Sequence, residues 1–401
     1  MKSSKASESY VPMYFLTSVG AGGLAVTFFM YLMFWIPHPG RSVPVFEDIM
    51  AAWATGGTSL KVAIAIAMAG IAVFVYLNLK SLIWNLSHFA QFKKTERYTK
   101  LRNSNAETTL LAMPLALAMS VNGLFITGLV FVPGLWTVVE YLFPLALIAF
   151  AAIAYTALRT IADFLGRVLS KGGVFDVTAH NSFAQLLPSF ALIMSAVGFA
   201  APAAMSTQPW IVAISVVGST VLGTAALIYA LLALTTAFNS MLHYGTAEEA
   251  GPTLLIIIPF VTIFSIMFMR QDHGLHATFN GHSTAVDTLM FLAKGLSVQL
   301  VFLGLGLTVL RRQGYFQDFV FGDKTSPGSY ALVCPGVALS VLLQFFVNKG
   351  LVAADVIEKF GTTYWVITAI AIAFQFAMIA LVFRLNAQHY GTRTPSAIPA
   401  E

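Results

Sequence analysis

The sequence predicts an all-α integral membrane protein with ten transmembrane helices. Of its 401 residues, 58% are hydrophobic and only 10% are charged, whereas soluble domains carry about 25% charged residues. Ten apolar segments also reach the roughly 17 to 25 residues that a helix needs to cross the hydrocarbon of a bilayer. The predicted spans are 13–36, 59–81, 108–131, 136–160, 184–204, 208–238, 252–270, 286–310, 328–349 and 363–386.

The first span also bears on processing of the chain. It follows a polar start, MKSSKASESY, but it is longer than the roughly 7 to 15 apolar residues of a signal peptide. We therefore expect it to remain as a membrane helix. The domain organisation is then a tail over 1–12, a transmembrane domain over 13–386 and a second tail over 387–401.

Basic residues lie in alternate connections between the spans. They include the segment 93–102 (KKTERYTKLR), the pair Arg167 and Lys171, and the pair Arg311 and Arg312. Lys and Arg collect on the cytoplasmic side of membrane proteins, so both tails are predicted to be cytoplasmic, in the inner membrane of a bacterium. The formal charge of +5 then reflects loop orientation, and no nucleic-acid partner is predicted.

Prolines recur inside the odd-numbered spans. Pro114, Pro188, Pro259 and Pro335 fall in the third, fifth, seventh and ninth spans, at separations of 74, 71 and 76 residues. Proline kinks a helix by removing a backbone hydrogen bond, and in lipid the freed groups need protein or water partners. The odd spans should therefore face inward, and five hairpins should form a quasi-fivefold ring around a central pore.

The first span has glycines where the other odd-numbered spans have a proline. Gly20, Gly22 and Gly23 lie within GAGG, and glycine weakens and thins a helix. The even-numbered spans mostly lack such breaks, Pro144 near the start of the fourth being the exception. We expect the three glycines to kink the first inner helix.

Five pieces of the odd-numbered spans carry a resemblance to a known family. They read YFLTSVGAGGLAVTFFM, MPLALAMSVNG, HNSFAQLLPSFALIMSAVGF, AEEAGPTLLIIIPFVTIFS and SYALVCPGVALSV. In order and proline spacing they resemble the tellurite-resistance/dicarboxylate transporter family, which includes plant slow anion channels. The resemblance implies a homotrimer with one pore per subunit, passing small inorganic anions or dicarboxylates. Oxyanions of sulfur, selenium or tellurium are among the candidates.

The resemblance also makes a departure visible in the ninth span. It puts Pro335 on the family's proline and Cys334 where those channels carry a pore-plugging phenylalanine. Without the plug, either the pore is wider at this level or another aromatic side chain blocks it. Phe190 and Phe260 follow prolines closely and are the candidates. The predicted constriction thus consists of Cys334, Pro335, Phe190 and Phe260.

Cys334 has two interpretations. As the only cysteine it cannot form an intrachain disulfide, and a free cysteine commonly behaves as a small hydrophobic residue. Alternatively it is a reactive thiol in the permeation path that captures a sulfur or selenium oxyanion or senses an oxidant. Both interpretations remain open at this point.

Two of the cations within even-numbered spans are candidates for anion attraction. Lys294 is inside the eighth span and Arg159 is near the inner end of the fourth. A charged residue in the membrane is a functional candidate by default, so both could attract anions. The alternatives are structural: Lys294 could extend to the interface or pair with Asp287, and Arg159 could anchor the helix end.

The stretch RQDHGLHATFNGH holds Asp272, His273, His276 and His282. Such residues can bind a divalent metal, but a wetted loop or a pH-sensitive vestibule fits equally, and no metal is predicted. No cofactor is predicted either, because the histidines lie in loops or at helix ends, away from positions suited to haem ligands.

The function predicted from the sequence is a passive path for small anions and not an enzyme. No carboxylate lies deep in a predicted span, although carboxylate relays are typical of proton-coupled pumps. The expected partners are lipid and copies of the same chain. Two alternatives remain open: a quinone-reactive membrane anchor subunit of an oxidoreductase, and a thiol-based sensor on a channel scaffold.

Overall fold

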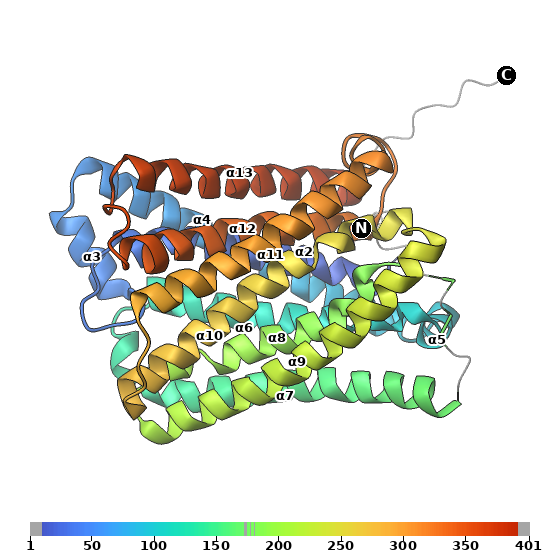
Figure 1. Ribbon diagram of the computed structural model, residues 1–401, viewed down its shortest axis with the longest axis horizontal. Helices are drawn as coiled ribbons and strands as arrows, with labels where there is room; N and C mark the ends of the chain where they lie inside the picture. Colours follow the sequence, from blue (N-terminus) through green and yellow to red (C-terminus); the bar gives the residue numbers. More distant parts are fainter. Residues whose placement is uncertain (1–9, 172–174, 177, 180, 392–401) are drawn as a thin grey trace.

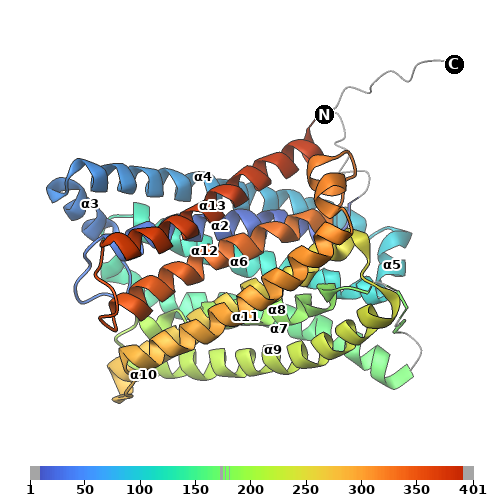
Figure 2. The same ribbon diagram turned by 45° about the horizontal axis from the view of Figure 1, so that its top comes forward.

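The computed structural model describes residues 10–171, 175–176, 178–179 and 181–391. Helices that run roughly side by side form one bundle, with α3 (Phe46–Thr55) at one end and α5 (Glu96–Arg102) at the other (Figures 1 and 2). Within these ranges there is no β-strand. The predicted all-α class is therefore confirmed.

Ten helical segments of the described chain are long and apolar enough to cross a membrane, as predicted. Their principal helices are α2 (Leu16–Trp35), α4 (Thr58–Phe92), α6 (Ala112–Phe131), α7 (Leu135–Lys171), α8 (Leu187–Phe199), α9 (Pro209–Tyr244), α10 (Ile257–Phe279), α11 (Ala285–Arg312), α12 (Val333–Phe345) and α13 (Thr362–Tyr390).

Several spans are longer than predicted. α4 has 35 residues and α7 has 37, so at 1.5 Å per residue each is about 50 Å long, well beyond the roughly 30 Å of hydrocarbon. Their final turns are polar, which is why hydrophobicity alone ended the predicted spans near 81 and 160. α10 likewise continues to Phe279 instead of ending at 270.

Burial alternates along the chain. In the odd-numbered spans, 56% to 89% of the most apolar window is buried, against 22% to 39% in the even-numbered spans. The odd spans therefore supply the interior of the bundle, while the even spans present apolar side chains outward. An outward apolar surface is what lipid requires.

The buried spans contact one another in sequence. α2 packs on α6, α6 on α8, α8 on α10 and α10 on α12, and α12 packs back on α2. Each also packs on the exposed helix that follows it in the chain: α4, α7, α9, α11 and α13. The buried helices therefore contact one another as well as the exposed helices.

The four recurring prolines lie where the helix type changes. A 3₁₀ segment precedes each α-helix, and Pro114, Pro188, Pro259 and Pro335 are the second or third residue of α6, α8, α10 and α12. Proline is well tolerated in the first turn of an α-helix. The predicted mid-helix kinks are therefore changes from 3₁₀ to α geometry near the start of each span.

The glycines of the first span serve close packing. α2 is continuous through Gly20, Gly22 and Gly23, so they do not interrupt it. A Cβ on Gly20 would lie 3.0 Å from Val333 of α12, and one on Gly22 would lie 2.6 Å from Met119 of α6. The small residues let the backbone of α2 approach its neighbours, as in other membrane helix interfaces.

Buried amides connect inner helices to outer helices. Asn78 Nδ2 of α4 donates to the Ser18 carbonyl of α2 over 2.8 Å. Gln299 Nε2 of α11 donates to Thr262 Oγ1 of α10 over 2.6 Å, and the Thr262 hydroxyl also donates to the Ala338 carbonyl of α12 over 3.0 Å. These bonds fix the rotation of the inner helices about their axes.

Glycine packing leads to a stability prediction. Gly22→Ala should destabilise the protein by about 1–3 kcal/mol, because overpacking forces neighbours to move, here Met119 and the Asn78 amide at 3.0 Å. Gly304→Ala is the matched control, since a Cβ there meets nothing within 4 Å and alanine favours helix by about 1 kcal/mol. Apparent melting temperatures in detergent should fall for Gly22→Ala only; equal values would contradict the packing role.

Candidate functional site

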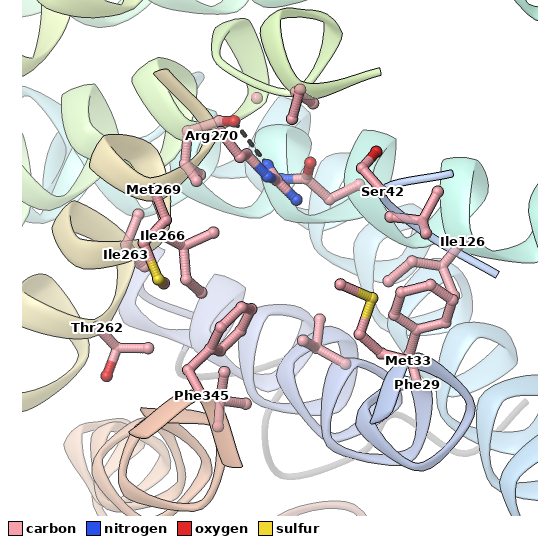
Figure 3. A pocket seen from close by; sticks show the side chains of 18 of the residues that line it. Phe29, Met33, Ser42, Ile126, Thr262, Ile263, Ile266, Met269, Arg270 and Phe345 are labelled. Carbon is pink, nitrogen blue, oxygen red and sulfur yellow. Dashed lines mark hydrogen bonds between the residues drawn. The ribbon is translucent and has the colours of Figure 1, made fainter. Parts of the chain in front are cut away.

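A cavity of about 540 Å³ lies among the buried helices and is lined by side chains from α2, α6, α8, α10 and α12. Its walls are largely apolar, as Figure 3 shows for Phe29, Met33, Ile126, Ile266 and Phe345. All five odd-numbered spans thus contribute to one space. The fold brings together residues more than 300 positions apart.

Three residues close the end of the cavity that lies near the starts of α8, α10 and α12. Phe190, Pro259 and Cys334 line the large cavity and also a second cavity of only about 20 Å³ on its other side. The smaller space has room for about one water molecule. These three side chains therefore separate the two spaces, and we call them the floor.

Two of the four predicted constriction residues belong to the floor. Phe190 and Cys334 line both cavities, whereas Pro335 and Phe260 line neither. The Phe260 ring instead stacks on Phe264 with centroids 6.2 Å apart. Pro259, expected only as a helix kink, occupies the place anticipated for Phe260.

Cys334 is a buried free thiol with 8% of its surface exposed. On the face of α12 that lines the cavity, it is followed by Val337, Val341 and Phe345, and Lys349 lies in the π-helical segment Phe346–Val352 that continues from α12. The spacing of these positions by three or four residues is that of one face of a helix. This face runs from the floor to the mouth.

The opposite end of the cavity, which we call the mouth, is rich in cations. Arg41, Arg270 and Lys349 line it, and within the described part of the chain Asp272 provides the single carboxylate there. Arg41 is paired with Asp48, with Nη1 and Oδ1 2.6 Å apart. The sequence does not predict a role for these three cations, because Arg41 and Lys349 lie at or beyond the ends of predicted spans and Arg270 is the last residue of the seventh predicted span.

Arg270 of α10 lies among apolar side chains of the cavity wall. Its Nη1 donates to the Val197 carbonyl over 2.7 Å, its only hydrogen bond within the described chain, where no carboxylate lies within 4.0 Å of it. Figure 3 shows the guanidinium directed toward the space between Met33, Ile126 and Ile266. Arg270 is partly buried, and a cation withdrawn from water without a counter-ion is costly, so the position favours an incoming anion.

The predicted metal candidates lie on α10 and in the turn after it. Asp272, His273 and His276 line the mouth, and His282 does not. Asp272 accepts from Ser283 Oγ over 2.5 Å, and His276 Nδ1 is 2.7 Å from the Gly281 carbonyl oxygen. Among the described residues, no three His, Cys, Asp or Glu side chains are placed to hold a metal ion.

Lys294 and Arg159 lie away from the cavity. Both are exposed, on α11 and α7 respectively, and neither lines the cavity. The expected pair between Lys294 and Asp287 is not formed: the Asp287 carboxylate accepts from Thr284 Oγ1 over 2.7 Å and caps the start of α11. Capping by an acidic residue stabilises a helix N-terminus.

No protein-family model matches this chain, and no curated protein matches it either.

The lone cysteine allows a test of access to the floor. We expect a small methanethiosulfonate reagent to label Cys334 in detergent through the large cavity, and Val341→Trp to slow labelling because the indole fills the passage above the thiol. Val366→Trp, at a position on α13 that is 58% exposed, is the matched control. Labelling followed by mass spectrometry should be slowed in the first variant only; equal rates would exclude this route.

His38 at the mouth leads to a pH prediction. Burial lowers its pKa, and Lys349 and Lys359 add to this, while the Ile36 carbonyl and Asp48 oppose it. The unfolded chain therefore binds a proton near pH 6.5 that the folded chain does not, so stability falls as pH decreases through that region. Between about pH 7.5 and 5.5, the melting temperature should decrease less in His38→Asn; an unchanged decrease would contradict this.

Proposed function

We propose that this protein is a membrane channel that passes small anions through a pore within the buried helices. The observation that carries the proposal is the cavity itself: all five buried spans line it, cations surround its mouth, and a narrow floor closes it. Pore diameter and electrostatic barriers are the usual determinants of selectivity in such paths.

The proposed architecture is a quasi-fivefold ring of five hairpins. The contacts of α2, α6, α8, α10 and α12 support it, because each packs on the next and the last packs on the first. The alternation of burial supports an inner and an outer layer. On the resemblance to the tellurite-resistance/dicarboxylate transporter family, we further propose a homotrimer with one pore per subunit.

The proposed orientation places the mouth on the periplasmic side of a bacterial inner membrane. Tyr14 OH and His389 Nδ1 lie 3.1 Å apart, so the first and last spans have adjacent ends, opposite the mouth. The basic segment 93–102 connects α4 to the third span at that end. The positive-inside rule then makes it cytoplasmic.

In the proposed mechanism, the mouth concentrates anions and the floor limits their passage. A unit charge 4 Å from a cation near a protein surface gains about 4 kcal/mol, so Arg270 and Lys349 draw anions into the cavity. Rotation of the Phe190 ring or a shift of α12 at Cys334 would connect the two cavities. Among the residues that the structure describes, Asp272 at the mouth is the only carboxylate that lines the path, which supports passive conduction.

Flux measurements test this function. Purified protein in liposomes should admit anions from a panel that runs from chloride to sulfite. Cys334→Phe should reduce this flux to the level of protein-free liposomes, because a phenyl ring beside Phe190 fills the floor.

Cys334→Ala is the control, since alanine is smaller than cysteine and should leave flux equal or greater. Absence of flux for every anion, with folded protein in the liposomes, would contradict the proposed function. Equal flux in Cys334→Phe and wild type would remove Cys334 from the path. Loss of flux in Cys334→Ala would instead favour the reactive-thiol interpretation.

A further inference from the structure

The main cavity is larger than a small inorganic anion requires. Its volume of about 540 Å³ compares with roughly 30 Å³ for one water molecule and lies within the roughly 300–1,000 Å³ of cavities that enclose drug-sized ligands. Such sites are mostly apolar, with a few placed polar groups. This cavity has the same character.

The walls offer more to an apolar body than to a hydrated ion. Phe29, Phe125, Phe150 and Phe345 bring four rings to the cavity, and Met33 and Met194 add flexible thioethers. A bare anion that enters would exchange water for carbon surface, which is unfavourable without polar partners. A ring or alkyl group would gain from leaving water.

The donors in the wall are suited to one carboxylate or sulfonate. The Arg270 guanidinium presents a planar fork of N–H groups that binds such anions through two parallel hydrogen bonds. One of its nitrogens is engaged by Val197, which leaves the others free to meet a ligand. Arg41 is occupied by Asp48, and Lys349 carries an ammonium group without such a fork, so a second anionic group would find no equivalent partner in the wall.

The position of Arg270 sets the direction of a ligand. It lies 11 residues after Pro259 on α10, so at 1.5 Å per residue it is about 16 Å above the floor. Between these levels, Ile263 and Ile266 of the same helix line the cavity. An anionic head at Arg270 therefore leaves its apolar body pointing toward Phe190 and Cys334.

We propose that the cavity is a binding site for amphipathic organic monoanions, carboxylates or sulfonates with a ring or alkyl body, held by Arg270 at the head and by the aromatic wall along the body. The site goes beyond conduction of small anions. Binding at this site requires only the closed cavity, so it can be tested separately from anion flux.

Titration calorimetry on the purified full-length protein tests this assignment, with 2-naphthoate as the probe. We expect affinity to increase from acetate through benzoate to 2-naphthoate, because more apolar surface is buried. The uncharged 2-naphthalenemethanol should bind at least about tenfold more weakly than 2-naphthoate, because charged hydrogen bonds contribute about 1.5–3 kcal/mol.

The variants separate charge from fold. Arg270→Gln should weaken 2-naphthoate binding by about tenfold or more, and Arg270→Lys should fall between it and wild type because charge remains but the fork is lost. Arg312→Gln is the charge-matched control. Arg312 is exposed at the C-terminal end of α11, whereas the N-terminal end of that helix lies at the mouth. Val341→Trp should weaken binding without any change of charge.

Two results would overturn the assignment. One is 2-naphthoate affinity that is equal in Arg270→Gln and Arg312→Gln, both monodisperse by size-exclusion chromatography. The other is an affinity no greater for 2-naphthoate than for the alcohol or acetate. Binding with the predicted pattern but without flux of any inorganic anion would support the site and contradict the channel, whereas flux without binding would do the reverse.

Discussion

The structure depends on one constraint of lipid: polar groups inside the hydrocarbon must find partners within the protein. The inner helices meet it by packing against outer helices that carry amides. The Asn78 amide of α4 donates a hydrogen bond to the Ser18 carbonyl of α2, and the Gln299 amide of α11 donates one to the Thr262 hydroxyl of α10. That hydroxyl in turn donates to a carbonyl of α12. Because these bonds fix how the inner helices are rotated, they also decide which side chains face the centre.

Arg270 is the informative exception to this constraint. The buried Glu107, which is 1% exposed, pairs with Arg102 and Arg167, whereas the partly buried Arg270 has no carboxylate partner within the described chain. Within the described chain, Arg270 donates one hydrogen bond, to the Val197 carbonyl. The rest of its guanidinium faces a cavity with apolar walls. A cation held without a counter-ion carries a free-energy cost, and an anionic ligand would offset it. Both functional proposals rest on this contrast.

The spans were predictable because length and apolar content follow directly from bilayer thickness, and the proline spacing identified the buried members. The ends of the spans were not predictable from apolar content, because polar turns such as the last turns of α4 continue as helix outside the hydrocarbon. The site was predictable only in part. The sequence predicts Phe190 and Cys334 at the constriction, but it predicts no role for Arg270 because the seventh predicted span ends at that residue. In the structure α10 continues to Phe279, so Arg270, His273 and His276 lie on a helix that lines the cavity. No local sequence pattern indicates that these three residues face a cavity.

The most direct test of the central claim, a pore selective for anions, is the reversal potential of the current through purified protein in a planar bilayer with a KCl gradient. The account predicts a reversal potential close to the equilibrium potential of chloride, with a larger current in Phe190→Ala because part of the floor is removed. A reversal potential close to that of potassium, or no current in either protein, would contradict it.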